Sequence, residues 1–413
     1  MSLIYNFLIS LTESILLALS FYNKNIEKFI KTRARTLRFL KDNIKSTDSY
    51  IWIHVASLGE YEQSVPIIKE IKKSNSKCKL ILSFFSNSGY DVKKDNSICD
   101  YTILLPLDTK KNAKAFLEII NPKMVFFVKY EFWPNYLKYL EERKIQTFLI
   151  VGVFRSNHWF FKYYGKWFRK RLKAFSHFFV IDENSMNILK KNGFKNSSVI
   201  GDSRFERVMD IKKSMNKVKY IEQFIRSRVC IVAGSTWKED EKLFINFINN
   251  KDFDNICFIM VPHQIHFKSI ESMKNSIKAK SSIMSQHQHV EGEKTKVMIV
   301  DSIGVLAKIY SYADIAYVGG GMGTTGLHNT LEPAVFKIPV IIGKNYDKFD
   351  EVKKLINLGG VISVDSQKSF DKNLIELINS KDKRSEIGEI NYNFIKNNLG
   401  ASKKVLESIK KIK

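Results

Sequence analysis

The sequence predicts an α/β protein with two doubly wound domains, each a mostly parallel sheet with helices on both faces. From Tyr50 onward, short apolar runs alternate with amphipathic segments, which is typical of βαβ units. The alternation stops in a polar, charged stretch at 210–228 and then restarts. A length of 413 residues also suits two domains better than one core. We therefore predict an N-terminal segment at 1–40, a first domain at 41–212 and a second domain at 213–413.

The order of the predicted elements follows from this alternation. In the first domain, strands are predicted at 51–56, 79–85, 101–105, 124–128, 147–153 and 177–181, and helices at 63–73, 109–120, 133–143, 159–172 and 184–191. In the second domain, strands are predicted at 229–233, 257–261, 297–300, 315–318, 339–342 and 360–364, and helices at 240–249, 303–312, 329–336, 349–355 and 384–411. Such sheets bind ligands beyond the carboxyl ends of their strands, so we expect a site in the cleft between the halves.

The N-terminal segment 3–22 is strongly apolar, and a basic stretch follows at 24–41. A cleaved signal peptide has its positive charge before the apolar core, so this segment does not fit one. Its length could span a bilayer, but Glu13 near its centre is costly there. We expect a helix attached to the membrane, with the basic stretch against an anionic cytoplasmic leaflet. A helix packed on the body of the protein fits the same pattern.

The chain is basic, with 67 Lys and Arg against 42 Asp and Glu and a net charge of +25. This excess favours nucleic acid, acidic membrane or phosphorylated substrates as partners. Lysines spread over every segment also fit a drift of base composition towards A and T, and that alternative stays open. No zinc-finger spacing, RNA-binding aromatic pattern or arginine-rich arm is present, which weighs against nucleic acid. Four scattered cysteines without C-x-x-C spacing indicate free thiols rather than a disulfide or zinc site.

The most informative segment is 316–332, AYVGGGMGTTGLHNTLE, where a strand-like run meets five glycines within eight residues. Gly320 lies in this loop, and His328, Asn329 and Glu332 lie where a helix is expected to begin. Glycines let backbone approach a ligand closely, and a helix N-terminus attracts negative charge. A nucleotide or sugar-phosphate site is therefore predicted, although an ordinary βα turn has the same composition.

Three charged residues mark the ends of first-domain segments. Glu60 follows the first strand in HVASLGE, and a carboxylate there could take a proton from a hydroxyl nucleophile. Glu131, in KYEFWPN, could support an oxocarbenium-like centre. Arg204, in GDSRF, could offset the charge of a leaving phosphate. Each also has a plain alternative, since acids favour the first turn of a helix and arginines favour the surface.

The second domain repeats small or polar residues at its strand ends. These strand ends contain Ser235 and Thr236, Pro262 and His263, and, beside Ser302, Ile303 and Gly304. Hydroxyl residues there act as helix N-caps or contact phosphate. His263 and His266 have no partners at metal-ligand spacing, so we expect no metal.

Taken in order, these segments resemble the 3-deoxy-D-manno-octulosonic acid (Kdo) transferases, which attach Kdo to lipid A precursors in Gram-negative bacteria. The motifs that carry the resemblance are HVASLGE, KYEFWPN, GDSRFERV, GSTWKEDE, VPHQIHF, DSIGVLAKIYSYADIAYVGGG and GLHNTLEPA. They cover nearly the whole chain, together with the apolar N-terminal anchor.

The resemblance implies a GT-B fold, in which two Rossmann-like domains face each other across a cleft. It implies inverting transfer of Kdo from CMP-Kdo to a bisphosphorylated lipid A precursor (lipid IVA) at the cytoplasmic face of the inner membrane, with release of CMP and without a metal or other cofactor. Glu60 matches the general base of the family, and Glu131 and Arg204 match positions that stabilise the transition state. Segments that contact CMP are matched by Pro262, His263, Ile303, Gly304, Val305, Asn329, Thr330, Leu331 and Glu332.

The chain departs from the family pattern at four positions. Many members have lysine at Arg204, arginine at His263, glutamate at Val305 and a second glycine at Leu327. These differences leave the nucleotide contacts and the number of Kdo units open. The alternatives are another GT-B enzyme that uses a UDP-sugar, either a transferase or an epimerase, and a non-enzymatic basic protein that binds membrane surfaces or nucleic acid.

Overall fold

The computed structural model describes residues 1–95, 98–213, 217–218, 220–253, 255–286 and 295–412, which form two compact units. Unit 1 comprises Met1–Arg207 and Leu399–Lys413, and unit 2 comprises Val208–Asn398. Each unit contains one seven-stranded sheet in which every pair of neighbours is parallel. The predicted class, an α/β protein with two doubly wound sheets, is confirmed.

The sheet of unit 1 has the strand order β3-β2-β1-β4-β5-β6-β7. Its strands are β1 (Ser49–Val55), β2 (Cys78–Phe84), β3 (Tyr101–Leu104), β4 (Met124–Val128), β5 (Gln146–Gly152), β6 (His177–Val180) and β7 (Ser197–Val199). Its main helices are α1 (Ser2–Leu19), α2 (Lys24–Asn43), α3 (Leu58–Ser74), α4 (Asn87–Lys93), α5 (Lys110–Ile120), α6 (Pro134–Glu142), α7 (Lys166–Arg171), α8 (Glu183–Lys191), α9 (Arg204–Lys213, which continues into unit 2) and α18 (Ala401–Ile412).

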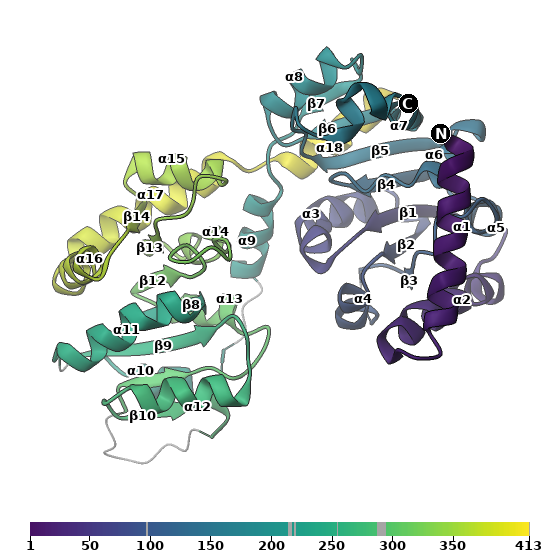
Figure 1. The fold of residues 1–413 in the computed structure, drawn as a ribbon. Coiled ribbons are helices and arrows are strands. Elements are labelled where there is room, and N and C mark those ends of the chain that lie inside the picture. Colours follow the sequence, from purple (N-terminus) through teal and green to yellow (C-terminus); the bar gives the residue numbers. More distant parts are fainter. Residues whose placement is uncertain (96–97, 214–216, 219, 254, 287–294, 413) are drawn as a thin grey trace. The chain divides into compact units, whose positions relative to one another are not determined.

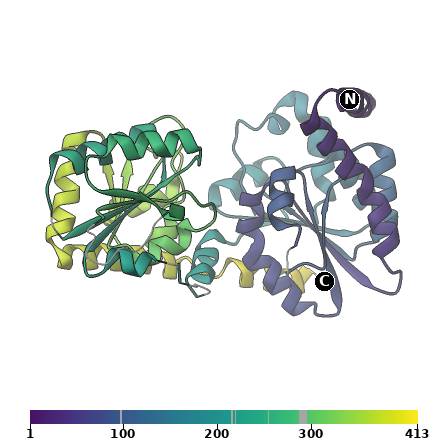
Figure 2. The same cartoon turned by 90° about the horizontal axis from the view of Figure 1, so that it is seen from below.

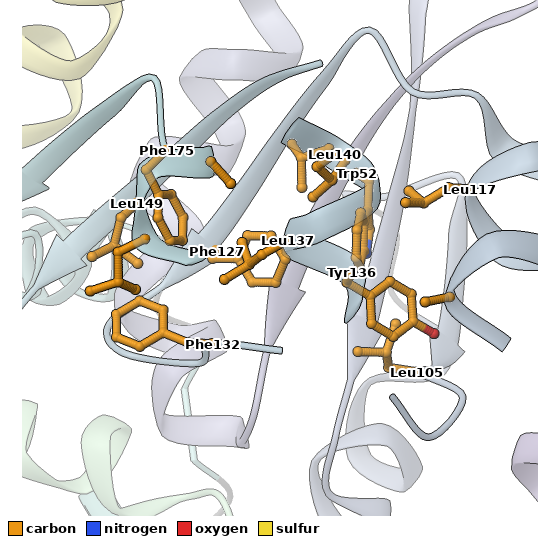
Figure 3. Packing of buried hydrophobic residues seen from close by; sticks show 14 of the residues in the cluster. Trp52, Leu105, Leu117, Phe127, Phe132, Tyr136, Leu137, Leu140, Leu149 and Phe175 are labelled. Atoms are coloured by element: carbon orange, nitrogen blue, oxygen red, sulfur yellow. The ribbon is translucent and has the colours of Figure 1, made fainter. Parts of the chain in front are cut away.

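Alternating side chains of β1 divide the interior of unit 1 into two cores. Tyr50 and Trp52 point to the face covered by α2, α5 and α6, whereas Ile51 and Ile53 point to the face covered by α3 and α18. Figure 3 shows the first core, in which Trp52 packs among aromatic rings such as that of Phe127. Because both faces are buried, the central strands are almost continuously apolar, as parallel sheets require.

The sheet of unit 2 has the strand order β10-β11-β9-β8-β12-β13-β14. Its strands are β8 (Val229–Thr236), β9 (Ile256–Pro262), β10 (Ser281–Ile283), β11 (Val297–Ile299), β12 (Ile315–Val318), β13 (Val340–Gly343) and β14 (Val361–Val364). Its helices are α10 (Ile221–Ile225), α11 (Lys238–Asn250), α12 (Phe267–Ser276), α13 (Leu306–Ile309), α14 (Leu331–Ala334), α15 (Asp350–Leu358), α16 (Gln367–Asn379) and α17 (Lys381–Asn397). Figure 2 shows these strands between two layers of helices.

Several predicted boundaries differ from the structure. The edge strands β7 and β10 and the helices α4 and α12 were not predicted, since short polar elements give no clear periodicity. The helix predicted at 159–172 is a series of short 3₁₀ turns followed by α7. The helix predicted at 384–411 is interrupted by Gly400, which has a φ of +113°, so that α17 and α18 are separate.

The C-terminal boundary of the second domain was wrong. Residues Leu399–Lys413 belong to unit 1, where Ala401, Val405 and Ile409 of α18 enter the core beside α3. The carboxylate of Glu206 caps this helix, accepting hydrogen bonds from the backbone N–H and the hydroxyl of Ser402. Both chain ends therefore lie in unit 1 (Figure 1).

The N-terminal segment is divided between two helices with different surroundings. Helix α1 has no buried residue, whereas α2 packs on unit 1 through Arg33, Thr36 and Leu40. The basic stretch was expected against a lipid surface, but Arg33 instead donates hydrogen bonds to Asn87 and to the backbone carbonyl of Phe85. Helix α1 is long and apolar enough to cross a membrane by length and composition.

Candidate functional site

The strand order reverses at one point in each sheet, and most of the predicted site residues follow the strands there. In unit 1, β1 and β4 are neighbours from which the chain proceeds outward in opposite directions. In unit 2, β8 and β12 are the corresponding neighbours, although β11 lies between β9 and β10 on the β8 side. The carboxyl ends of strands at such a reversal form the usual ligand crevice of doubly wound sheets. Glu60 and Glu131 follow β1 and β4, while Thr236 ends β8 and the glycine loop follows β12.

Glu60 lies in the first turn of α3 and is only 7% exposed. Its Oε2 accepts a hydrogen bond of 2.6 Å from the backbone N–H of Ala56, so the carboxylate also stabilises the helix start, as the plain alternative supposed. Within the described residues, Oε1 of Glu60 has no hydrogen-bond partner. Burial raises the pKa of Glu60 above its ordinary value, against the opposing effects of the Ala56 N–H and the nearby Lys129. Such a carboxylate has one oxygen free for proton transfer.

Lys129 and Glu131 lie in the turn that follows β4, close to Glu60. Burial lowers the pKa of Lys129, and the charge of Glu60 partly restores it. Burial, with a smaller contribution from Glu60, raises the pKa of Glu131 to about 7. Lys129 also has a φ of +61°, a left-handed conformation that is uncommon for a residue with a side chain and often marks a functional turn.

Arg204 belongs to the same electrostatic group, because its charge lowers the pKa of Lys129. Its guanidinium is paired with Asp202, with Nε and Nη2 at 2.8 and 2.6 Å from Oδ2. Asp202 Oδ1 also accepts the backbone N–H of Arg204 at the start of α9. The side chain is therefore held in place rather than loose on the surface, and Asp202 reduces the net charge it offers to a ligand.

A buried polar chain, absent from the predicted site, holds the turn after β4. Trp133 Nε1 donates a hydrogen bond of 3.0 Å to His54 Nε2, and His54 Nδ1 lies 2.8 Å from Ser83 Oγ. Burial lowers the pKa of His54 to about 3, so the ring is neutral; since Nε2 accepts, Nδ1 carries the proton and donates to Ser83. The chain ties the motif KYEFWPN to β1 and β2. His54 belongs to the motif HVASLGE and Trp133 to KYEFWPN, but no sequence pattern indicated that the two side chains would be in contact.

Asp240 organises the corresponding end of unit 2 and was also missed. This fully buried carboxylate accepts hydrogen bonds from the backbone N–H groups of Trp237 and Gly320 and from the hydroxyl of Tyr317, at 2.9, 2.8 and 2.6 Å. It therefore joins the first turn of α11 to the glycine loop. An acid in the run KEDE is expected in a first helical turn, so its sequence context does not distinguish Asp240 from its neighbours.

The glycine loop is shaped mainly by contacts inside unit 2. A side chain on Gly319 would collide with the backbone carbonyl of Ser235, and one on Gly320 with that of Gly326. Gly320 also has a φ of +90°. Close approach between the ends of β8 and β12 is therefore one reason for these glycines, which supports the ordinary turn alternative for part of the loop. Gly326, with a φ of +103° and open space where a side chain would lie, does not pack in this way.

Two of the predicted histidines meet at a tryptophan near this loop. The ring of His263 stacks on Trp237 with centroids 4.7 Å apart and lies 4.4 Å from the ring of His328. Trp237 Nε1 donates to His328 Nε2 at 3.3 Å. Burial and the adjacent His263 lower the pKa of His328 to about 4, so it is neutral at physiological pH.

A pocket of about 670 Å³ opens beside these rings. It brings together Thr236 and Pro262 from the predicted set, Trp237 and the loop residue Thr325. Lysines and acidic side chains of α11 also line it, and burial raises the pKa of one of them, Glu241, to about 7. A half-neutralised acid and several lysines suit an anionic ligand better than a cationic one.

The two remaining predicted segments lie beside each other near the end of β8. Gly304, with a φ of +84°, leads into α13. Leu306 of α13 and Tyr310, in the turn after it, occupy the space above Gly234. Burial raises the pKa of Tyr310, and the negative charge of Glu332 raises it further. Helix α14 also contacts the turn that follows α13. Ile303 is 91% exposed and Val305 is half-buried, so both are open to a ligand.

The segment before α14 contains an unused hydroxyl. Asn329 Oδ1 accepts the backbone N–H of Leu331, and its amide donates to Glu332. Leu331 itself is fully buried, so its side chain packs rather than binds. In the described part of the chain, the buried Oγ1 of Thr330 has no hydrogen-bond partner. A buried polar atom without a partner costs stability unless a ligand or water satisfies it.

The predicted residues thus form two groups, one in each unit. Unit 1 brings together Glu60, Glu131 and Arg204 around Lys129, and unit 2 gathers the others around Trp237 and Asp240 and at the end of β8. Among the described residues, no group of three His, Cys, Asp or Glu side chains is arranged to hold a metal ion.

Comparison with known proteins finds similarity to Kdo transferases. A family model described as 3-deoxy-D-manno-octulosonic-acid transferase matches residues 30–207. A 3-deoxy-D-manno-octulosonic acid transferase of Haemophilus influenzae is 27% identical over 387 residues, covering 87% of this chain and 86% of the relative. A bifunctional glycosyltransferase/methyltransferase of Fusobacterium nucleatum is also 27% identical, covering 89% of this chain, which spans only 58% of that longer protein.

Solved structures agree on the fold. The UDP-GlcNAc 2-epimerase of Neisseria meningitidis superposes with a TM-score of 0.62 at 16% identity, covering 88% of this chain and all of the epimerase chain. Together with the two Rossmann-like sheets, this likeness shows a GT-B fold. The chain is similar to 3-deoxy-D-manno-octulosonic acid transferases over most of its length, and to their family model at residues 30–207.

Proposed function

We propose that this protein is an inverting glycosyltransferase that moves Kdo from CMP-Kdo to a lipid A precursor and releases CMP. The observation that carries the proposal is a pair of carboxylates, Glu60 and Glu131, which follow adjacent strands at the reversal of the unit 1 sheet. Glu60 interacts electrostatically with both Glu131 and the positive charge of Lys129. General-base transfer requires an ionised, partly desolvated carboxylate next to an open position. Glu60 is desolvated by burial, and the charge of Lys129 favours its ionised form, which supports this role.

In the proposed reaction, Oε1 of Glu60 accepts the proton of an acceptor hydroxyl. The oxygen of that hydroxyl attacks the anomeric carbon of Kdo from the face opposite the phosphate. The bond from that carbon to the phosphate oxygen breaks and its electron pair leaves with CMP. Glu131 and Arg204 are proposed to stabilise the charges that develop, and the positive charge of Lys129 keeps Glu60 ionised.

Unit 2 is proposed to hold the CMP group. Its candidate contacts are Ser235, Thr236, Pro262, His263, Ile303, Gly304, Val305, Gly320, His328, Asn329, Thr330, Leu331 and Glu332. Three features support this assignment: the buried Thr330 hydroxyl, which has no partner among the described residues, the stacked rings of His263 and Trp237, and the lysine-lined pocket. Buried Leu331 contributes through its backbone.

The acceptor is proposed to be a bisphosphorylated acyl-disaccharide at the cytoplasmic face of the inner membrane. The apolar side chains of α1 point outward, among them Leu3 and Phe7 at 78% and 67% exposure. Exposed basic residues of α2, such as Arg35 and Arg38, follow in sequence. An apolar face followed by basic residues is the usual composition of a helix on an anionic membrane.

Incubation with CMP-Kdo and tetraacylated lipid IVA tests the proposal. We expect a product heavier by one or more Kdo units in mass spectrometry, and the same rate after treatment with EDTA, because no metal is needed. CMP should raise the thermal midpoint while UDP should not, since only a ligand of the native state stabilises it. Stabilisation by UDP alone, without Kdo transfer, would assign the chain to another GT-B activity.

Replacing Lys129 with Met should change the pH dependence of transfer. Glu60 acts when ionised, so activity rises with pH through its pKa, which burial raises and Lys129 lowers. Without the lysine charge that pKa rises, and the rising limb should move to higher pH by about one unit. Lys123→Met, at an exposed position before the same strand, should leave the profile unchanged. If the rising limb of the pH profile did not move in Lys129→Met, the charge of Lys129 would not control the pKa of the catalytic base.

A further inference from the structure

Helix α1 is tied to unit 1 by polar side chains, although most of its sequence is apolar. Tyr5 donates a hydrogen bond of 2.7 Å to Asp108, Asn6 accepts one of 2.9 Å from Asn135, and Glu13 accepts one of 2.9 Å from Asn112. The ring of Tyr5 also lies 5.7 Å from that of Trp167. Glu13, which is costly in a bilayer, is therefore one of three polar side chains that hold α1 on the protein.

The remaining face of α1 is apolar and uncovered within unit 1. Its exposed large side chains are Leu3, Ile4, Phe7, Leu8, Leu11, Ile15, Leu17 and Leu19. Figure 1 shows α1 along the outside of unit 1, beside α2 and α5. A helix that crossed the bilayer would have to leave these polar partners, whereas one that lies in the lipid surface keeps them. A lipid surface is therefore the occupant that fits this face.

Asp108 also holds the start of α6. Its Oδ2 and Oδ1 accept the backbone N–H groups of Asn135 and Tyr136, both at 3.0 Å. Helix α6 has no cap from its own sequence, because Trp133 at the N-cap position makes no side-chain hydrogen bond there. A carboxylate from another segment, only 1% exposed, takes that role.

The two roles of Asp108 meet at one oxygen. Oδ2 accepts both the Tyr5 hydroxyl of α1 and the Asn135 N–H of α6. Asn135 closes the motif KYEFWPN, four residues after Glu131. Its side-chain amide in turn donates to Asn6 of α1 and to the backbone carbonyl of Asp108. The position of α1 is thus connected, through hydrogen bonds at every step, to the helix start that anchors the Glu131 turn.

We propose that Asp108 is a positioning residue that couples the lipid-bound position of α1 to the order of the turn carrying Glu131. In this scheme, lipid covers the apolar face of α1 and holds the helix against unit 1. Tyr5 and Asn6 then stabilise Asp108 and Asn135, and the first turn of α6 becomes more rigid. The role of the coupling in turnover rests on the proposed function, but the coupling itself does not.

Hydrogen exchange at the amides of Asn135 and Tyr136 tests the coupling without any assay of turnover. With vesicles of anionic phospholipid, we expect these amides in the unaltered protein to exchange about tenfold more slowly than without vesicles. The Tyr5→Phe variant should lose this response but should still bind the vesicles in a flotation assay, because the apolar face of α1 is intact. Tyr22→Phe is the matched control, since Tyr22 is 90% exposed, and should respond like the unaltered protein.

A second arm measures transfer to vesicle-borne acceptor. Tyr5→Phe should lower kcat about fivefold to tenfold and leave KM for the acceptor unchanged, whereas a helix that serves only as an anchor would change KM or vesicle binding. If the amides respond to vesicles equally in Tyr5→Phe and in the unaltered protein, or in neither, the coupling is wrong. If the unaltered protein transfers no Kdo, the proposed function fails, and the exchange arm still decides the coupling.

Discussion

Replacing Glu60 with Gln is expected to reduce Kdo transfer by about 10²–10⁴-fold, the usual contribution of a general base. Gln preserves the shape of the side chain, and its carbonyl oxygen can still accept the Ala56 N–H that helps α3 begin. The loss should therefore fall on kcat, with binding of CMP-Kdo retained, because the nucleotide contacts are assigned to unit 2. Initial rates with lipid IVA and titration calorimetry with the donor measure the two quantities.

Glu62→Gln is the control for this substitution. Glu62 lies two residues further along α3 and pairs with Lys93 and Arg207, away from the Glu60 carboxylate. Its loss removes two partly exposed ion pairs and should lower stability, but it should leave turnover of the folded protein unchanged. Normal turnover by Glu60→Gln would remove Glu60 from the base role, and an equal loss in both variants would indicate damage to α3.

Replacing Asp240 with Ala is expected to produce the largest loss of stability in unit 2. Three buried donors would lose their acceptor at once. Each unsatisfied buried donor costs about 1–3 kcal/mol, so the loss of one acceptor for three donors should lower the free energy of unfolding by about 3–9 kcal/mol. Affinity for CMP should fall as well, because the same carboxylate joins the glycine loop to the first turn of α11. Thermal unfolding with and without CMP measures both effects.

Two related variants distinguish this role from a general effect of charge. Asp240→Asn keeps one acceptor oxygen but turns an amide group towards other donors, so its loss should be intermediate. Glu239→Ala removes the neighbouring charge, which is exposed, and should hardly change the midpoint. If Asp240→Ala were as stable as Glu239→Ala, the three hydrogen bonds would not hold the loop.

The sequence predicted the central strands well because their burial on both faces makes them continuously apolar. The predicted strands 124–128 and 315–318 coincide with β4 and β12. Short, partly polar edge strands such as β7 carry no such pattern and were missed. The assignment of the last helix failed for another reason: amphipathic periodicity shows that α18 has an apolar face, but not which core receives it.

The candidate site was also predicted only in part. Motif order indicated the resemblance to Kdo transferases and placed Glu60 and Glu131 after strands, which the sheet order makes neighbours. The groups that position these residues were not predictable, because their contacts join distant segments. The bond between Trp133 and His54 spans 79 positions, and that between Tyr5 and Asp108 spans 103. Site roles carried over from the family remain predictions until the substitutions above are measured.

The return of α18 to unit 1 affects how the protein is made. The chain emerges from the ribosome with the amino end first, and the α3 side of the first sheet lacks Ala401, Val405 and Ile409 until the final residues follow. Unit 2, which is continuous, has all of its sequence available before then. During synthesis, the apolar patch beside α3 is thus exposed longest, and chaperones that bind apolar segments are expected to recognise it on stalled or truncated chains.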